Sequence, residues 1–238
     1  MTGLEARGLS YAYGDKQALD DVSFSVSSGV FCALLGPNGA GKSTLFNLLT
    51  RLFVAPHGQI VIAGHDLRTA PRAALAQLGI VFQQTTLDLD LTVRQNLGYF
   101  AALHGLSGRS ARTRIDGALD QLDMRDRADE KARALNGGHR RRTEIARALL
   151  HDPGVLLLDE PTVGLDAAAR ASITDYAHTL ADAGKTILWA THLTDEVRPE
   201  DDLIVLHNAR VYAKGTARAI AADMTLQDRF LSLTGVGT

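Results

Sequence analysis

One segment constrains the fold of this chain more than any other. The apolar run VFCALL (30–35) leads directly into GPNGAGKST (36–44), and the apolar run LFNLL follows. The glycine spacing and the Lys-Ser pair match the P-loop pattern, in which a buried strand enters a loop and a helix leaves it. Glycine lets successive backbone N–H groups wrap around phosphate oxygens, and the helix dipole faces the same anion. The segment therefore predicts an α/β domain with a nucleoside triphosphate site.

Each position in this loop has a chemical reason. Lys42 has the reach to bind the β- and γ-phosphates, and Ser43 has the hydroxyl that binds Mg²⁺. A dinucleotide-binding loop is the alternative, but its glycine spacing differs and it does not need the Lys-Ser pair. The predicted nucleotide ligands in the loop are Gly36, Asn38, Gly39, Gly41, Lys42, Ser43 and Thr44.

The rest of the chain supports the same fold class. The runs GIVF (79–82), VLLLD (155–159) and TILWAT (186–191) lack polar alternation, as do strands buried on both faces of a parallel sheet. Helical patterns separate them. The first part alternates instead, in LEARGLSYAYG, ALDDVSFSV and GQIVIAG. We expect one α/β domain over 1–238: a P-loop core with a mainly parallel sheet, an N-terminal antiparallel β subdomain and an inserted α-helical subdomain at about 87–150.

Polar side chains follow the predicted strands at the edge where ligands of parallel sheets collect. Asp159 and Glu160 end VLLLDE; Asp159 suits a magnesium ligand, and Glu160 suits the general base that deprotonates an attacking water. His192 follows the next strand and is expected to contact the γ-phosphate. Gln83 ends GIVFQ and is expected to contact the metal or the water, with Gln84 as its alternative.

Two further stretches suggest ligand contacts. Tyr13, before a glycine, is expected to stack on an adenine, with Tyr11 as the alternative. In ALNGGHRRRTEIARALL (134–150), two glycines precede a helix whose buried face repeats through Ile145, Ala148 and Leu149. A helix start without side chains binds anions well, so this is either an anion site or only a flexible entrance to a helix with a solvated basic face.

Composition removes several classes of function. The formal net charge of −2 gives no overall attraction to nucleic acid or anionic lipid. The single cysteine excludes an internal disulfide and fits a reducing compartment. The first residues lack the apolar core of a signal peptide, and no run approaches the roughly 18 apolar residues of a membrane span. Membrane association would therefore depend on a partner.

Taken in order, these motifs resemble the nucleotide-binding subunit of ATP-binding cassette (ABC) transporters. The match includes Tyr13, the P-loop, Gln83, the signature at 135–139, VLLLDE, VGLD at 163–166, and His192. The resemblance implies an ATPase that uses ATP and Mg²⁺, in which two cassettes, expected to be a homodimer, enclose two ATP molecules head to tail. It further implies a separate membrane permease as partner, no nucleic acid, and a peripheral position on the cytoplasmic face of the inner membrane.

The same resemblance assigns roles at the signature. Asn136, Gly137, Gly138 and His139 would contact the γ-phosphate held by the second subunit, and Asp166 would lie at the subunit contact. The family usually has serine and glutamine where this chain has Asn136 and His139. The asparagine amide can still donate to phosphate, but its longer side chain must be placed differently. The three arginines that follow (140–142) are expected to support the helix start and its neighbours rather than catalysis, and the alternative for one of them is a position facing the seam between subunits.

Two stretches indicate a subtype. TTLDLDLTVRQNLGYFAALHGL and TLQDRFLSLTG resemble the exporter branch that includes drug and sodium efflux ATPases, and LNGGHRRR is similar to a sequence in transporters linked to quinoprotein alcohol oxidation. A closing helix is expected at about 223–234, with Leu226, Phe230 and Leu233 on one face.

Three alternatives remain beside ATP-driven export. The first is a soluble ABC ATPase acting on DNA or the ribosome, although such chains usually have a second cassette or a long coiled coil, and only Thr44 to Leu135 separates the P-loop from the signature here. The second is a cassette that gates a membrane complex without transport. The third is a small-molecule P-loop kinase, which gives no reason for LNGGH.

Overall fold

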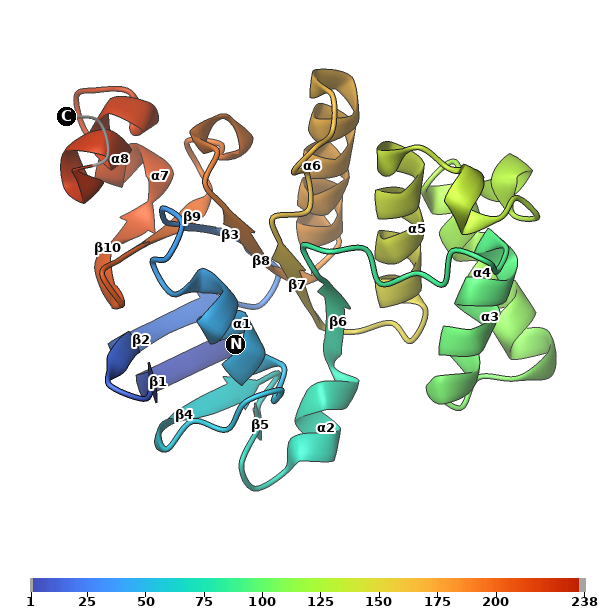
Figure 1. Cartoon of the computed structure of the whole chain (residues 1–238), viewed down its shortest axis with the longest axis horizontal. Helices are drawn as coiled ribbons and strands as arrows, with labels where there is room; N and C mark the ends of the chain where they lie inside the picture. Colours follow the sequence, from blue (N-terminus) through green and yellow to red (C-terminus); the bar gives the residue numbers. More distant parts are fainter. Residues whose placement is uncertain (1, 236–238) are drawn as a thin grey trace.

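The computed structural model describes residues 2–235, which form two sheets and the helices that cover them (Figure 1). The antiparallel sheet has the order β2-β1-β4-β5, and the six-stranded sheet has the order β10-β9-β3-β8-β7-β6. The first contains β1 (Thr2–Tyr13), β2 (Lys16–Ser27), β4 (His57–Ile62) and β5 (His65–Asp66). The second contains β3 (Phe31–Leu35), β6 (Leu78–Val81), β7 (Val155–Asp159), β8 (Thr186–Thr191), β9 (Asp202–His207) and β10 (Arg210–Thr216).

The six-stranded sheet is the centre of the molecule. Strands β6, β7, β8, β3 and β9 pair in parallel and β10 pairs antiparallel to β9. Every residue of β3, β7 and β8 is buried, which explains why these segments are apolar without alternation. Because the strands are parallel, their carboxyl ends meet at one edge, and that edge carries the P-loop, Gln83, Glu160 and His192. The α/β prediction, including the antiparallel sheet and the mainly parallel one, is confirmed.

Two apolar cores lie on opposite faces of this sheet. Alternate residues of β3 divide between them: Phe31, Ala33 and Leu35 pack with the core under α5 (Gly137–Leu149) and α6 (Ala167–Asp182). Cys32 and Leu34 pack instead with α1 (Lys42–Leu49) and the antiparallel sheet. The sheet is therefore covered on both faces, as a parallel sheet requires.

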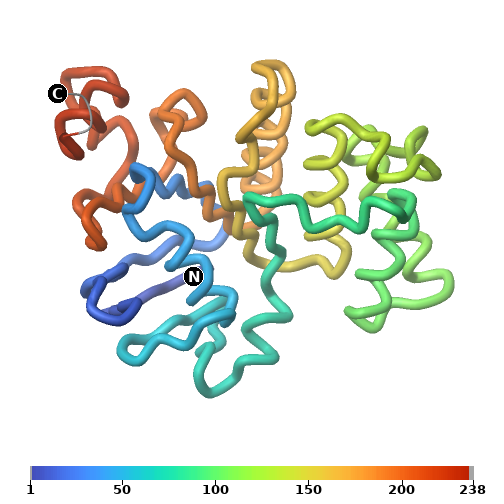
Figure 2. The backbone as a smooth tube through the Cα atoms, in the orientation of Figure 1, coloured from blue at the N-terminus to red at the C-terminus, as the bar shows by residue number. Residues whose placement is uncertain are grey.

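The helical region leaves the core after β6 and returns through α5 into β7 (Figure 2). It contains α3 (Val93–Leu103) and α4 (Gly108–Gln121), and α2 (Pro71–Ala76) precedes β6. α3 begins with a capping box: the Thr92 hydroxyl accepts from Gln95 N at 3.1 Å, and the Gln95 side chain accepts from Thr92 N at 2.9 Å. One face of α4 is buried at Ile115, Ala118 and Leu119.

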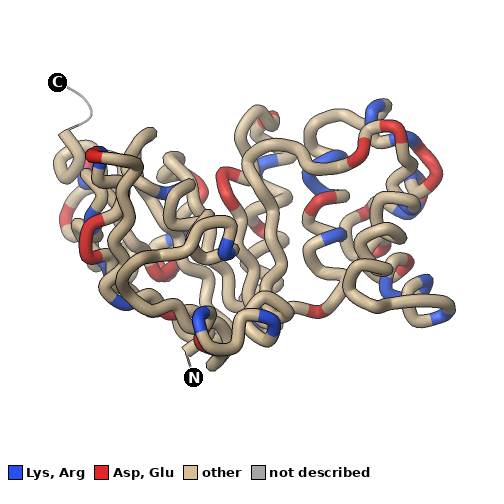
Figure 3. The backbone as a smooth tube through the Cα atoms, turned by 60° about the horizontal axis from the view of Figure 1, so that its bottom comes forward, with Lys and Arg blue, Asp and Glu red and all other residues tan. Residues whose placement is uncertain are grey.

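The chain closes with α7 (Ala217–Ala221) and α8 (Leu226–Thr234). Phe230 of α8 is buried and Leu226 packs partly against the core. Within residues 2–235, no helix combines the length and apolar character needed to cross a bilayer. Acidic and basic residues lie interleaved along the helical region (Figure 3).

Candidate nucleotide-binding and catalytic site

The P-loop joins β3 to α1 by a tight path that only glycine permits at two positions. Gly41 has φ 110°, and a Cβ there would come within 2.5 Å of the Ala18 carbonyl oxygen. A Cβ on Gly36 would come within 2.6 Å of the Leu206 carbonyl oxygen. α1 begins at Lys42, and among the described residues no side chain caps it. Its first N–H groups therefore face the loop without a competing side-chain acceptor, as an anion site requires.

Lys42 lies inside this loop and reaches the catalytic edge. Its ammonium donates to the Gly36 carbonyl oxygen at 2.6 Å and lies 3.3 Å from Glu160 Oε1. The side chain is only 5% exposed, so its charge is held among polar partners rather than in water. The pocket around it is lined by Tyr13, Lys16, Gln17, Ala18, Pro37, Asn38, Gly39, Gly41, Lys42, Ser43, Thr44, Gln83 and Glu160.

Glu160, which follows β7, is contacted by side chains that follow the two strands β6 and β8. Gln83 Nε2 donates to its Oε2 at 3.1 Å, and His192 Nδ1 lies 3.5 Å from its Oε1, the same oxygen that Lys42 contacts. Glu160 follows β7 directly, has φ 45°, and donates its N–H to the Ala190 carbonyl at 2.9 Å. A glutamate in the left-handed region is strained, and such strain concentrates at functional positions. The three contacts make Glu160 the best-placed carboxylate for a water at this edge.

Asp159 lies beside it in a less favourable environment for charge. Burial raises its pKa to about 6; the neighbouring Glu160 adds to this, and Lys42 and Arg141 oppose it. A cation would relieve this repulsion. Hydroxyl, amide and carboxylate oxygens are offered by Ser43, Gln83 and Asp159, and these hard donors suit Mg²⁺. Within residues 2–235, no group of three or more His, Cys, Asp or Glu side chains is arranged to hold a metal ion.

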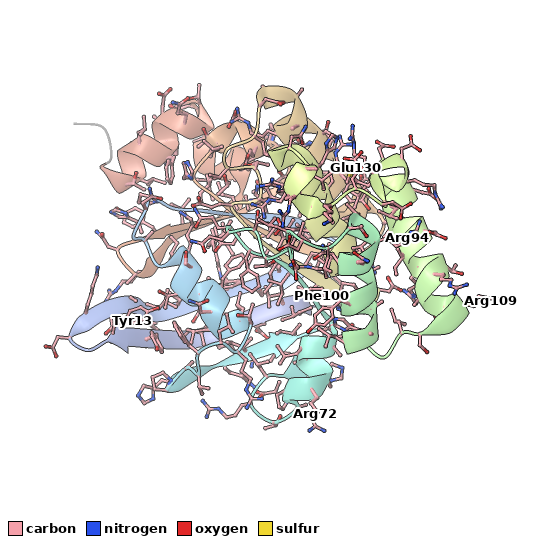
Figure 4. The ribbon with its side chains drawn as sticks, turned by 45° about the vertical axis from the view of Figure 1, so that its right-hand side comes forward. Tyr13, Arg72, Arg94, Phe100, Arg109 and Glu130 are labelled. Carbon is pink, nitrogen blue, oxygen red and sulfur yellow. The ribbon has the colours of Figure 1, made fainter. Side chains whose placement is uncertain are left out.

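The structure distinguishes between the two tyrosines and between the two glutamines that the sequence offers as alternatives. Tyr13 is 47% exposed, lines the pocket, and its hydroxyl lies 3.4 Å from Thr44 Oγ1. Tyr11 instead stacks flat on Phe53, with ring centroids 5.4 Å apart. Of the two tyrosines, Tyr13 is therefore the one that lies at the pocket (Figure 4). Gln83 lines the pocket and Gln84 does not.

The signature segment forms a second hollow that shares no lining residue with the first. Asn136 is the N-cap of α5, and its Oδ1 accepts from His139 N at 2.8 Å. Asp166 caps α6 in the same way, accepting from Ala169 N at 2.8 Å. A Cβ on Gly137 would lie 3.2 Å from Leu165 Cδ2. The hollow is lined by Asn136, Gly137, Gly138, His139, Arg142, Gly164, Leu165, Asp166 and Ala169.

Sequence reasoning missed a buried charged network on α5. Arg141, Glu144 and Arg147 are all nearly inaccessible and bind the backbone of residues 82–86, which contains Gln83. Their spacing of three was the available signal, because it places all three on neighbouring turns of one helix face. A second missed group is Glu196, which accepts from Trp189 Nε1 at 3.0 Å and from the Thr162 hydroxyl.

Comparisons with known proteins agree with this geometry. Residues 19–163 match the family model described as ABC transporter. The chain is 39% identical over 223 residues to the daunorubicin resistance ATP-binding protein DrrA3 of Streptomyces coeruleorubidus, covering 93% of this chain and 71% of that protein. It is 40% identical over 213 residues to a Nod factor export ATP-binding protein I of Ralstonia nicotianae, covering 89% of this chain and 66% of that protein, just under two thirds of its length.

A solved structure shows the same fold. A dimeric ATP-binding cassette in a post-hydrolysis state, bound to ADP and Pi, superposes with a TM-score of 0.79 at 27% identity, covering 90% of this chain and 98% of that one. Its fold, the family match and the P-loop edge described above lead to one conclusion. The chain belongs to the ABC transporter family and is one of its ATP-hydrolysing, nucleotide-binding chains.

Proposed function

We propose that two copies of this chain close on two ATP molecules and power a separate membrane permease for export. The observation that carries the proposal is the convergence of Lys42, Gln83 and His192 on Glu160 beside the P-loop. Each cassette supplies one complete half of a site. The signature hollow of the second copy supplies the other half, because two equivalent sites follow from a two-fold dimer.

Within one copy the residues act in sequence. The P-loop N–H groups and Lys42 bind the phosphates, and Tyr13 stacks on the adenine. Glu160 accepts the proton of the attacking water, while Gln83 and His192, both in contact with Glu160, orient it and the γ-phosphate. Mg²⁺, held by Ser43, Gln83 and Asp159, would neutralise charge on the phosphate oxygens. ATP and Mg²⁺ are thus the expected ligands.

The second copy contributes the start of its α5. Gly137 and Gly138 leave backbone N–H groups uncovered, and Asn136 and His139 flank them at the same hollow. Asp166, at the opposite wall, would lie at the subunit contact. The relative that forms a dimeric cassette with ADP and Pi supports this pairing.

The proposed permease partner and the proposed direction of transport rest on other observations. Large apolar side chains of the helical region are exposed, with Leu89 at 41%, Tyr99 at 60% and Leu103 at 64%. Tyr99 and Leu103 lie one turn apart on α3, and adjoining exposed apolar side chains of this kind commonly mark a protein contact. One relative is named for Nod factor export and another for daunorubicin resistance, which favours export. We infer a peripheral position on the cytoplasmic face of the membrane, where ATP is supplied.

Replacing Glu160 with glutamine tests the site and the dimer together. Glu160→Gln keeps the size of the side chain but loses the base, so turnover should fall by about 10²–10⁴-fold while ATP still binds. The variant should accumulate as an ATP-dependent dimer in light scattering. Glu200→Gln is the matched control, because Glu200 is exposed and, within residues 2–235, its ion pair is with Arg218. Normal turnover in Glu160→Gln would refute the general base, and a monomer at saturating ATP would refute the sandwich.

The permease needs its own experiment. Tagged protein is recovered from detergent-solubilised membranes and its partners are identified by mass spectrometry. A stoichiometric partner with several membrane spans is the expected result. Recovery of ribosomal or DNA-associated proteins alone would contradict the transporter function and favour the soluble alternative.

A further inference from the structure

The segment that carries Gln83 has little regular structure of its own. Between β6, which ends at Val81, and α3, which begins at Val93, the backbone forms neither helix nor paired strand apart from a bridge at Thr92. Backbone polar groups in such a segment need partners. Four of them, on residues 82 to 86, find those partners in side chains of α5 rather than in their own neighbourhood.

Arg141 supplies the first two contacts. Its Nη1 donates to the Phe82 carbonyl at 2.6 Å and its Nη2 donates to the Gln83 carbonyl at 2.9 Å. The same Nη1 also donates to Glu144 Oε2 at 2.9 Å. The planar guanidinium therefore spans two consecutive carbonyls and one carboxylate, a geometry that a lysine ammonium cannot reproduce.

Thr86 is held from both sides by the next turns of the helix. Its N–H donates to Glu144 Oε1 at 2.8 Å, and its carbonyl accepts from Arg147 Nη1 at 3.2 Å. Arg147 in turn lies 4.3 Å over the ring of Phe100, on α3 (Figure 4). All three charged side chains are nearly inaccessible, so these bonds act in a medium where they are strong and where losing one partner is costly.

We propose that Arg141, with Glu144, is a positioning residue that fixes the Gln83 backbone so that the Gln83 amide reaches Glu160. The contacts form one path: α5, Arg141, the Gln83 carbonyl, the Gln83 amide and Glu160. α5 begins at the signature glycines. A phosphate from the second copy that displaces the start of α5 would thus also displace Gln83 at the first site. The inference rests on the proposed role of Gln83 in ATP hydrolysis.

The test substitutes lysine at two neighbouring arginines. Arg140 also binds two backbone carbonyls, of Ala132 and Arg133, at 3.0 and 2.8 Å, but not the Gln83 segment. Arg141→Lys keeps the positive charge but loses the planar guanidinium that binds two carbonyls at once. We expect its kcat for ATP to fall by about ten- to a hundred-fold with KM nearly unchanged, because Gln83 is misplaced. Arg140→Lys should retain the parent kcat.

A double variant separates positioning from general damage. In the Gln83→Ala background, Arg141→Lys should reduce kcat no further, since both changes remove the same contact. Independent losses that multiply would overturn the proposal, as would a wild-type kcat in Arg141→Lys. A loss in Arg141→Lys combined with a normal kcat in Gln83→Ala would also overturn it.

Hydrogen exchange tests, without any ATP turnover, whether Arg141 tethers the segment around Gln83 to α5. Peptides covering residues 83–88 should exchange about tenfold faster in Arg141→Lys than in Arg140→Lys, as expected when one charge-assisted hydrogen bond is lost. Equal exchange would refute the tether. If the parent protein lacked ATPase activity, the proposed function would fail, and hydrogen exchange would still decide whether Arg141 holds this segment.

Discussion

The chain presents two glycine-rich helix starts, and they are built differently. α1 begins at Lys42 after Gly41 and, among the described residues, has no side-chain cap. α5 begins at Gly137, and Asn136 caps it by accepting from His139 N at 2.8 Å. The first start keeps its N–H groups for a ligand, while the second gives one of them to its own asparagine.

Their surroundings differ as well. The α1 start has a buried lysine, a glutamate, a glutamine and an aromatic ring from four different elements around it. The α5 start has Asp166 on its far wall and an arginine beside it, and the ends of two helices form most of the hollow. One start is a nearly complete site, whereas the other, in the proposed dimer, is half of a site whose remaining groups come from a second molecule.

The cap also explains how this chain accommodates asparagine in the signature. Asn136 Oδ1 faces the helix N–H groups, so the amide nitrogen is the end that remains to donate to a phosphate. One side chain thereby caps the helix and offers a donor.

Breaking the α1 start should have the largest effect. Lys42→Ala removes the cation of the P-loop and leaves the Gly36 carbonyl and Glu160 without their partner. ATP affinity should fall by about 10²-fold or more, since charge-assisted bonds to phosphate are lost. Calorimetric titration with ATP measures this, and the exposed Lys214 changed to alanine is the control. Near-normal affinity and hydrolysis in Lys42→Ala would remove the P-loop assignment.

Disrupting the α5 start should leave the binding of ATP to each monomer intact. Asn136→Asp keeps a good N-cap, because aspartate accepts as well as asparagine. It loses the amide donor and puts a negative charge where a phosphate is expected. ATP should still bind each monomer normally, whereas turnover should fall by about tenfold or more through like-charge repulsion.

The decisive measurement is dimer formation by the double variant Asn136→Asp, Glu160→Gln with ATP. It should stay monomeric where Glu160→Gln alone dimerises. Asn136→Ser, which keeps a capping oxygen and a donor, should still dimerise. An undiminished dimer in the aspartate variant would mean that the α5 start does not contact the nucleotide.

The two helix starts also differ in how much of each could be predicted from the sequence. The P-loop is local: nine consecutive residues between a buried strand and a helix specify the site, so its fold follows from the segment itself. The strand-end residues were found because parallel strands bring their carboxyl ends together. The convergence of Lys42, Gln83 and His192 on one carboxylate depends on strand order, which no single segment encodes.

The tether from α5 was hidden for a different reason. Arg141, Glu144 and Arg147 have the composition of a solvated helix face, and the sequence predicts only that the run of three arginines supports the helix start and its neighbours or faces the subunit seam. They are buried because an irregular segment supplies carbonyl and N–H partners across about sixty residues of sequence. The spacing of three could place these side chains on one helix face, but side-chain pairing with irregular backbone has no periodicity, so the sequence could not show what they bind.

The smallest expected effect concerns the C-terminal end of α5, which lies away from the starts of α1 and α5. His151, just after α5, stacks on His104 at the end of α3, with ring centroids 3.8 Å apart. His151 Nε2 lies 2.9 Å from the Leu78 carbonyl oxygen. Burial lowers the pKa of both histidines, and the His104 charge lowers that of His151 further. The folded state therefore resists protonation at this stack.

Acid should consequently weaken the protein at this point. Below the unfolded pKa of about 6.5 the unfolded chain binds more protons than the folded one, so stability falls as the pH drops from about 7.5 to about 5.5. The contribution should stay below about 1 kcal/mol, because the stack is partly exposed and solvent screens it. His104→Phe keeps a flat ring and removes one titrating group, so its loss of stability over this range should be smaller. The Asp159 pKa, raised to about 6, acts in the opposite direction in both proteins and cancels in the difference.

Urea unfolding at the two pH values measures the difference, with His57→Phe, an exposed position on β4, as the control. ATP affinity at the α1 start should be the same in His104→Phe and the parent, because the stack shares no residue with that pocket. Equal pH dependence in His104→Phe and the parent would show that the stack does not contribute to acid sensitivity. A change in ATP affinity would show that the far end of α5 is coupled to the P-loop more strongly than the contacts through Arg141 imply.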